Sequence, residues 1–544
     1  MREAPAHLLG SACHLCDSIS EALKMTRSVD VAIIGGGLVG NLLARQLRRH
    51  SPELSVALFE RDTERTYKVG ESTVEIAANY LSRRLGLSTY LYQEHLPKNG
   101  LRFFFDTEAK DAPLHEMSEI GLGGMPPYPS FQFDRARLEK DLLEMNEKDG
   151  VHVEIGGRVK DLDLGEGGAA HTFSVAGDTE TEWKARWVVD GTGRAAMIAQ
   201  LKGLRMPERD HRIASAWGRF SNITDIDDWS APDWHARVNH TARGLSTNHF
   251  CYKGYWIWFI PLGQGLTSVG ICAERDSWDK SYHEPEGMVA NLRKHRAIDQ
   301  LMENAELVDH GAFSQLAYRT KQFFSADRWA VLGEAAAFPD PFYSPGSDVI
   351  AVENDLTASL IAHDTKGEDI RERVKAYDDL MHFRYETILL LTHKQYCTMG
   401  SFELLRAKAF FDCACYYNLW FDSYAKDDHL NLKIVQRMLR RGDSVLTVMR
   451  NFRDLFSSAA TTLLERGDYY RLNTGVGLHD AMDAFGPITN VGSKRSPVAI
   501  DRRTEEIFNR TAELVHGILD DGSKFEKRRF IEFAEPGAFD QARV

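Results

Sequence analysis

Residues 29–50 read VDVAIIGGGLVGNLLARQLRRH, and this stretch decides the fold. The apolar run at 29–34 predicts a short buried strand, and the segment at 42–47 predicts an amphipathic helix. Between them stand three glycines in G-x-G-x-x-G register, namely Gly35, Gly37 and Gly40. The first permits a tight turn, the second lets the backbone approach a pyrophosphate, and the third lets the helix pack on the strand. The N-terminus of such a helix presents N–H donors to the anion.

A second apolar run, SVALFER at 55–61, predicts the next strand of the same unit. It ends in Glu60, about 20 residues beyond the glycines, where an acid can accept a ribose hydroxyl. Arg61 directly follows Glu60, and we expect it to be a further cofactor-binding residue. With a strand before it, a helix after it and an acid at this distance, the glycine motif predicts dinucleotide binding.

Two later segments repeat the pattern of a buried strand that runs into glycine and an acid. RWVVDGTGR at 186–194 contributes Asp190 and Gly191, and DRWAVLGEAAAFPDPFYSPGSD at 327–348 contributes Gly333 and Glu334. A nicotinamide fold completes its site within one βαβ unit and its neighbours, whereas these segments are far apart. The dispersed pattern resembles the FAD-binding half of the single-flavin monooxygenase superfamily. That superfamily usually has Gly-Asp-Ala in the third segment, and Glu334 offers the same carboxylate on a longer side chain.

Composition limits the partners of the chain. It has 544 residues, which predicts two or three domains, and a formal net charge of −13. The excess of acid argues against nucleic acid and anionic membranes, because both select basic surfaces. No stretch approaches twenty apolar residues, so no membrane span is predicted. Seven scattered cysteines are typical of a reduced, cytoplasmic protein.

The first residues predict a flexible leader with no metal site. Cys13 and Cys16 form a CxxC within it, but no second pair follows to complete a zinc site. The leader lacks a long apolar core, which makes it a poor signal peptide.

The predicted fold class is α/β. It combines an FAD-binding Rossmann-like domain of the flavin monooxygenase type with a mixed substrate-side β-sheet and an α-helical C-terminal region. The expected divisions are a leader at 1–28, the first part of the FAD-binding domain at 29–204, the substrate-side sheet at 205–320, the last part of the FAD-binding domain at 321–365, and the helical domain at 366–544.

The stretch GYWIWFIPLG at 254–263 places two tryptophans one residue apart. In a strand, Trp256 and Trp258 share one face, and Pro261 is expected to end the run because it lacks an N–H. Core packing is one explanation, since aromatic residues favour sheets. The other is that the indoles wall off part of a functional site.

Three stretches together resemble the flavin-dependent halogenases, over roughly residues 29–365. They are the Trp-x-Trp-x-Ile-Pro strand, YKVGESTVE at 67–75 and EHLPKNGLRFFFD at 94–106. The resemblance implies that Lys98 is the catalytic lysine, since it stands in the family's Lys-x-Gly-x-Arg-Phe context. Lys68 is the rival lysine, but it directly precedes the Val-Gly-Glu turn, where the family needs no base. The further cofactor-binding residues that the resemblance implies are Glu71, Ser72, Thr73, Pro341, Gly346 and Ser347.

The resemblance also implies a chemistry. Reduced FAD, supplied by a separate flavin reductase, reacts with dioxygen and halide to give hypohalous acid. Lys98 would hydrogen-bond this acid or carry the halogen as a haloamine toward the substrate ring. Trp256 and Trp258 would then keep the organic substrate away from the flavin, which suppresses direct hydroxylation. The implied function is halogenation in secondary metabolism.

Two departures from the family bear on substrate and halide. Tryptophan-directed members have a glutamate where this chain has Tyr343, which favours a phenol, a pyrrole or another electron-rich substrate, free or carrier-bound. The family holds halide partly through backbone N–H groups of a Ser-x-Gly turn, and here the middle residue is Pro345, which has none. An ionised Asp348 would also repel an anion.

Two other functions stay open at this point. One is a monooxygenase or oxidase on the same scaffold that acts on its substrate directly without halide, and the other is a flavin-holding scaffold without turnover. The aromatic cluster at 410–421 is expected either to line the substrate pocket or to form helix core.

Overall fold

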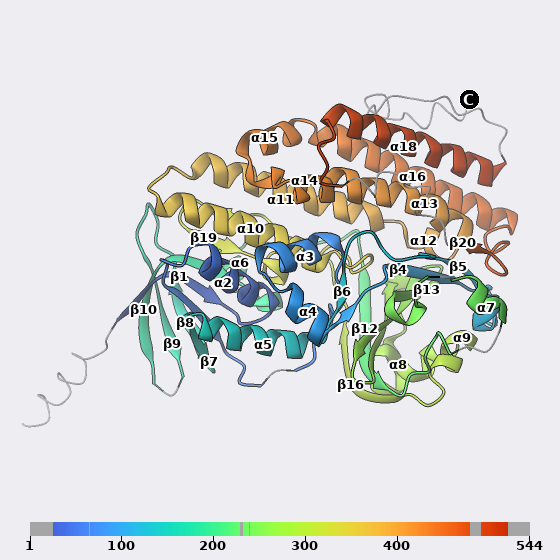
Figure 1. The fold of residues 1–544 in the computed structure, drawn as a ribbon, viewed down its shortest axis with the longest axis horizontal. Helices are drawn as coiled ribbons and strands as arrows, with labels where there is room; N and C mark the ends of the chain where they lie inside the picture. Colours follow the sequence, from blue (N-terminus) through green and yellow to red (C-terminus); the bar gives the residue numbers. More distant parts are fainter. Residues whose placement is uncertain are drawn as a thin grey trace, which may run out of the picture.

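The computed structural model describes residues 26–520, except 65, 178, 229–231, 239 and 479–490. Residues 1–25 of the expected leader, with Cys13 and Cys16, therefore lie outside the described residues. The fold confirms the predicted class: an α/β layer, a second mixed sheet and a C-terminal layer of helices (Figure 1).

The α/β layer is built on the strand that precedes the glycine motif. β1 (Arg27–Ile34) lies between β2 (Val56–Glu60) and β10 (Thr181–Asp190) and is parallel to both. The sheet order is β18-β19-β10-β1-β2-β7, with β9 antiparallel to β10 and β8 antiparallel to β9. The other strands of this sheet are β7 (His152–Ile155), β8 (Arg158–Asp163), β9 (His171–Ala176), β18 (Phe324–Ser325) and β19 (Trp329–Val331).

The predicted acid and glycine segments meet at one edge of this sheet. β1, β2, β10 and β19 run parallel, and their carboxyl ends lead into the four segments singled out in the sequence. Ligands of open parallel sheets bind outside such carboxyl ends. The helices packed nearby are α2 (Leu38–His50), α5 (Arg135–Lys148) and α10 (Gly346–Thr365).

The second sheet is mixed and carries the tryptophan strand at its centre. Its order is β16-β12-β15-β14-β13-β4-β5-β20, mostly antiparallel, with β4 parallel to β13. Its strands are β4 (Leu101–Phe105), β5 (Ser118–Ile120), β12 (Ile213–Ser221), β13 (Thr247–Tyr252), β14 (Tyr255–Gly263), β15 (Leu266–Glu274), β16 (Glu306–Phe313) and β20 (Gly477–Leu478).

Alternate residues of β14 face different cores, as the period of a strand requires. Trp256 and Trp258 pack in one cluster, and Ile257 and Phe259 pack in another on the opposite face. The expectation that Pro261 ends the strand is wrong, because β14 continues to Gly263 and pairs with β15 there. Pairing with β13 stops at Phe259, so the proline lies where only one neighbouring strand remains, and a register shift follows it.

The C-terminal helices form a layer that contacts both sheets (Figure 1): α11 packs on β18, α12 on β14 and α13 on β5. This layer comprises α11 (Arg371–Thr392), α12 (Tyr396–Met399), α13 (Phe402–Ala414), η8 (Cys415–Phe421), α14 (Asp422–Ala425), η9 (Asp428–Leu430), α15 (Leu432–Arg440), α16 (Gly442–Arg466) and α18 (Pro497–Leu519).

Short elements connect these layers. The helices are α3 (Glu75–Asn79), η1 (Tyr80–Arg84), α4 (Ser88–Glu94), η2 (Leu114–Glu116), η3 (Gly193–Ala195), α6 (Met197–Leu201), α7 (Pro232–Ala236), η4 (Arg243–Leu245), η5 (Arg275–Ser277), η6 (Lys280–His283), α8 (Pro285–Leu292), α9 (Arg296–Leu301) and η7 (Gly333–Ala335). The strands are β3 (Leu96–Pro97), β6 (Phe131–Gln132), β11 (Arg205–Pro207) and β17 (Tyr318–Thr320).

Candidate functional site

The glycine loop is shaped by two close approaches and one open position. A Cβ on Gly35 would meet the Gly191 carbonyl oxygen at 2.4 Å, and a Cβ on Gly40 would meet the Gly35 oxygen at 2.0 Å. Gly37, the residue before α2, has nothing within 4 Å of its Cβ position. No side chain caps this helix. The loop therefore leaves room and backbone donors where a phosphate would lie.

The acid that ends β2 turns back toward this loop. Glu60 is buried, and its carboxylate accepts hydrogen bonds from the backbone N–H groups of Gly36 and Asp62, each at 2.8 Å. Gly36 was not among the predicted residues, yet a Cβ there would meet Glu60 Cβ at 2.8 Å. Arg61 points the other way: its side chain is exposed and pairs with Asp62 at 3.4 Å.

The segments that follow β10 and β19 lie against the glycine loop and the helix after it. Asp190 is fully buried, and its carboxylate accepts hydrogen bonds from the backbone of Thr192 at 3.0 Å and of Ile198 at 2.6 Å. Gly333 has φ +58°, and its N–H donates to Glu353 Oε2 at 2.5 Å. These contacts order the loops that follow β10 and β19, and the Gly191 N–H joins the first of these loops to the end of β1 by donating to the Ile34 carbonyl at 2.8 Å.

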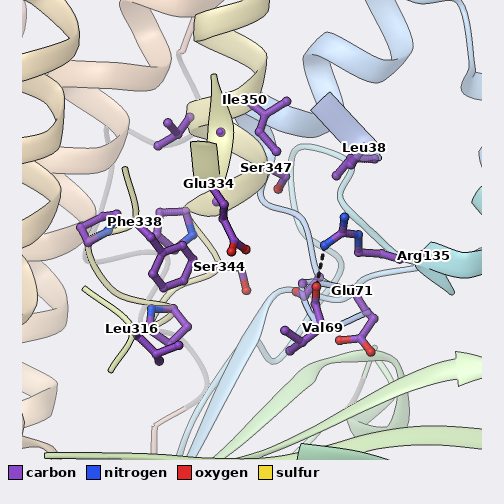
Figure 2. Close-up of a pocket in the computed structure, with 18 of the residues that line it drawn as sticks. Leu38, Val69, Glu71, Arg135, Leu316, Glu334, Phe338, Ser344, Ser347 and Ile350 are labelled. Atoms are coloured by element: carbon purple, nitrogen blue, oxygen red, sulfur yellow. Dashed lines mark hydrogen bonds between the residues drawn. The ribbon is translucent and has the colours of Figure 1, made fainter. Parts of the chain in front are cut away.

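A first cavity of about 150 Å³ opens between the glycine-loop helix and the tryptophan strand (Figure 2). Glu334, Ser344 and Ser347 point into it from one side, and Glu71 and Arg135 face them. The predicted residues that line it are Glu71, Ser72, Trp256, Trp258, Gly333, Glu334, Pro341, Gly346 and Ser347. Sequence reasoning missed Arg135, which donates to the Val69 carbonyl at 2.6 Å and stands on α5, a helix with no motif.

The N-terminus of α10 faces this first cavity. Gly346 has open space around its Cβ position, and the buried hydroxyl oxygen of Ser347 has no hydrogen-bond partner among the described residues. Oriented N–H donors at the start of a 20-residue helix favour an anion or a polar heteroatom. The open glycine loop, the Ser347 hydroxyl and the cavity lined by both Leu38 and Ser347 fit a bound FAD.

A second cavity, of about 180 Å³, lies under the C-terminal helices. Lys98, Tyr343 and Phe103 line one part of it, and residues of α11, α13 and η8 line another part. Of the aromatic cluster whose role was left open, Phe410, Tyr416, Tyr417 and Trp420 line this cavity. Phe411 instead stacks on Phe452 in the helix core at 4.3 Å. The cluster is therefore divided between the lining of the second cavity and the helix core.

Lys98 is buried in the loop between β3 and β4, with only 2% of its surface exposed. Its Nζ donates to Ser72 Oγ and to the Thr73 carbonyl, both at 2.8 Å. Burial lowers the pKa of Lys98 to about 7, although Glu75 and Asp348 partly oppose this shift. The amine is therefore present in both protonation states near neutral pH.

Ser72 and Pro345 join the two cavities. Ser72 lines the first cavity, while its hydroxyl bonds to Lys98 in the second and lies 2.9 Å from Thr247 Oγ1. Pro345 lines both. Thr73 is fully buried, and its hydroxyl donates to the Phe131 carbonyl at 2.9 Å. Lys68 lies elsewhere, partly exposed and paired with Glu139 at 2.8 Å.

An aromatic layer separates the cavities. Trp256 lines the first cavity and Phe342 lines the second, and the centres of their rings are 5.2 Å apart. His249 and Phe103 also lie one on each side, and their rings are stacked with centres 4.9 Å apart. The two indoles lie 5.4 Å apart, and their N–H groups donate to Tyr396 and Ser268. The tryptophans thus form one side of a partition that is two rings thick.

Comparison with known proteins decides the identity. Residues 28–386 match the family model described as FAD binding domain. "Flavin-dependent halogenase chlA" of Dictyostelium discoideum is 29% identical over 437 residues, which cover 74% of this chain and 71% of the relative. The chain belongs to the flavin-dependent halogenases of the FAD-binding domain family. It is an FAD-dependent oxidoreductase of the halogenase type.

Two further similarities are more distant. "1H-pyrrole-2-carbonyl-[peptidyl-carrier protein] chlorinase" of Pseudomonas fluorescens is 24% identical over 395 residues, covering 67% of this chain and 85% of the relative. The structure titled "Crystal structure of halogenase PltM in complex with phloroglucinol and FAD" has a TM-score of 0.64 at 16% identity, covering 89% of this chain and 96% of that one. The latter likeness concerns the fold. No helix in the described part of this halogenase is long and apolar enough to span a membrane.

In this halogenase, Tyr343 is held by a strained turn and by a C-terminal helix. Tyr343 and the next residue, Ser344, have φ of 68° and 58°, a region that favours glycine. The Tyr343 hydroxyl donates to Asp412 Oδ2 at 2.6 Å, and Lys408 pairs with the same carboxylate. Burial raises the pKa of Tyr343 well above its usual value. Asp412 was not predicted, because only the tertiary fold brings α13 to this turn.

Asp348 does not face the first cavity, where it had been expected to repel an anion. Its carboxyl group lines the second cavity and accepts hydrogen bonds from the Ala77 N–H at 2.7 Å and the Tyr416 hydroxyl at 2.9 Å. Burial raises the pKa of Asp348 to about 7. The start of α10 therefore presents Gly346 and Ser347, without a carboxylate, to the first cavity.

Proposed function

We propose that this halogenase attaches a halogen to an electron-rich aromatic substrate, other than tryptophan, that binds in the second cavity. The observation that carries the proposal is the position of Lys98, whose amine lines that cavity while it bonds to Ser72 of the first. Reduced FAD in the first cavity supplies, with dioxygen, the oxidising equivalent that converts halide to hypohalous acid.

The residues of the chain direct this acid to the substrate. As an ammonium, Lys98 donates a hydrogen bond to the oxygen of the hypohalous acid and makes the halogen more electrophilic. As a neutral amine, it takes the halogen from the acid, and water leaves. A pKa of about 7 makes both routes available near neutral pH. The layer of Trp256 and Phe342 keeps the substrate ring from the flavin.

Tyr343 supports a phenol-like or pyrrole-like substrate. Tyr343 stands where tryptophan-directed members have a glutamate, so the turn supplies no carboxylate of its own that could polarise an indole. The Tyr343 hydroxyl is bonded to Asp412 instead. The substrate is either free or tethered to a carrier; a relative that is 24% identical is named a chlorinase of a carrier-bound pyrrole. We assign the enzyme to secondary metabolism, with a separate reductase as its flavin partner. The cysteines of the described part form no disulfide, which supports a cytoplasmic location.

The product formed with each halide tests this function. Purified enzyme, a flavin reductase, FAD and a phenol or pyrrole substrate are incubated in halide-free buffer with added chloride or bromide. Mass spectrometry is expected to show one halogen added, of the type supplied. A product that instead carries an added oxygen, formed at full rate without halide, would favour direct monooxygenation, the alternative that the missing N–H of Pro345 raises.

Replacing Pro345 with threonine is expected to tighten the halide requirement. The substitution adds a backbone N–H at the start of α10, beside Gly346 and Ser347. A charge-assisted bond to an anion contributes about 1.5–3 kcal/mol, or roughly ten- to a hundredfold in affinity. The half-saturating halide concentration should fall by that factor, and bromide should saturate before chloride because it is easier to desolvate.

Pro345→Ala separates the amide from the side chain, because it restores the same N–H without a hydroxyl group. It should act as Pro345→Thr does. An unchanged halide dependence in both variants would place the halide away from this turn.

A further inference from the structure

The second cavity contains two guanidinium groups that form no ion pair with any described residue. Arg384 on α11 and Arg406 on α13 both line it, and the Nε of each is buried without a hydrogen bond. Among the described residues, neither side chain forms an ion pair within 4.0 Å. Arg384 is the more buried of the two, 6% exposed, and its guanidinium lies 5.8 Å from the centre of the Trp420 ring.

The carboxyl groups that line the same cavity are already engaged. Glu75 accepts from the Tyr417 hydroxyl at 2.6 Å. Asp348 accepts from Tyr416 and the Ala77 N–H, and Asp412 accepts from Tyr343 and pairs with Lys408. Asp348 interacts electrostatically with Arg384, but the carboxylate oxygens of Asp348 accept their hydrogen bonds from Tyr416 and the Ala77 N–H. The acids of the cavity are thus satisfied, and its arginines are not.

A buried cation without a partner is unfavourable unless an anion joins it. We propose that the second cavity binds its aromatic substrate as an oxyanion, an ionised carboxylate or acidic phenol, held by the guanidinium of Arg384. Guanidinium donors match the oxygens of such groups in geometry and charge. The inference rests on the proposed function only in calling the ligand a substrate.

The size and lining of the cavity support an aromatic anion. A buried apolar space of about 150 Å³ accommodates benzene, and this cavity holds about 180 Å³. Phe103, Phe410 and Trp420 supply aromatic walls. A phenolate is also the form of a phenol that an electrophilic halogen attacks most readily, and a neighbouring cation stabilises it. If the anion is the carboxylate, the substrate is a free acid, because a carrier thioester removes that charge.

Binding to the FAD-loaded, oxidised enzyme tests the inference without turnover. Isothermal titration calorimetry in halide-free buffer compares benzoate with methyl benzoate, and 4-nitrophenol, at a pH at which it is ionised, with 4-nitroanisole. At least one anion is expected to bind ten- to a hundredfold more tightly than its neutral methyl derivative. The pair that shows this difference identifies the oxyanion. Equal affinities within both pairs, or tighter binding of the neutral members, would overturn the proposal.

Arg384→Gln should lower the preference for the anion, with any remainder due to Arg406 and Lys98 in the same cavity, while binding of the neutral ligands changes little. Arg384→Lys should keep part of the preference, since it retains a positive charge. Arg373→Gln is the matched control: Arg373 lies on the same helix, outside the cavity, and bonds to Tyr377 at 2.9 Å. A preference that is unchanged in folded Arg384→Gln contradicts the assignment. The comparison within the wild-type enzyme stands even if that variant does not fold.

The outcome is separable from that of the proposed function. No halide, reductase or dioxygen chemistry enters the titration, so an enzyme that oxygenates its substrate could still prefer the anion. Conversely, halogenated product together with equal binding of anion and neutral ligand would overturn only this inference.

Discussion

Lys98→Ala is expected to lower the yield of halogenated product at least about a hundredfold while flavin reoxidation by dioxygen continues. A positioned proton donor or acceptor contributes typically 10²–10⁴-fold to a rate, and here the same amine also directs the halogen. Alanine leaves Ser72 and Thr73 without their shared donor, but Lys98 itself does not line the first cavity. Product analysis beside the rate of flavin reoxidation separates the two steps.

Two variants control for this result. Lys98→Arg should be nearly as inactive, because a guanidinium keeps its proton and cannot act as an amine. Lys68→Ala should retain activity, since Lys68 is partly exposed and pairs with Glu139 outside both cavities. Full product yield from Lys98→Ala would show that another residue delivers the halogen.

Gly37→Asp is expected to weaken FAD binding roughly a hundredfold or more, since like charges brought together at a binding site cost several kcal/mol. The position has open space for a Cβ, so the fold should tolerate the new side chain. Its carboxylate would lie beside the backbone N–H groups at the start of α2, where we expect the pyrophosphate of FAD to bind. Titration of the apoprotein with FAD, followed by flavin fluorescence, measures the change.

The control for added charge is Gly517→Asp on α18, another glycine with nothing within 4 Å of its Cβ position. It should bind FAD as the wild-type enzyme does. If Gly37→Asp also retains wild-type affinity and thermal stability, the pyrophosphate lies away from this loop.

The fold could be predicted because its signals are local. The glycine motif, the strand that precedes it and Glu60 lie within about thirty residues, and backbone geometry restricts what such a sequence can form. Pro261 shows the limit of local reasoning. Whether a proline ends a strand depends on which neighbouring strands are still paired at that point, and β13 has already stopped pairing there.

The site could be predicted only in part, because its contacts span the chain. Trp256 and Lys98 stand in recognisable motifs, but the partition needs Phe342, more than eighty residues after Trp256. Asp190 shows a different limit: the sequence names it as a candidate cofactor-binding residue at a strand end, but does not show that its carboxylate accepts hydrogen bonds from the backbone of Thr192 and Ile198. Arg384 and Asp412 carry no motif, and only the packing of α11 and α13 over the second cavity reveals them.

The burial of Lys98 has a consequence for how this sequence can evolve. A folded-state pKa of about 7, below the usual 10.5, means that the unfolded chain holds the extra proton between these values. The free energy of unfolding therefore rises with pH between about 7 and 10.5. Below about pH 7 the folded protein bears the full cost of burying a charged amine. Methionine at this position would remove the penalty. Natural selection keeps a destabilising residue only while its chemistry is used, so a lineage that loses halogenation should soon replace this lysine with an apolar residue.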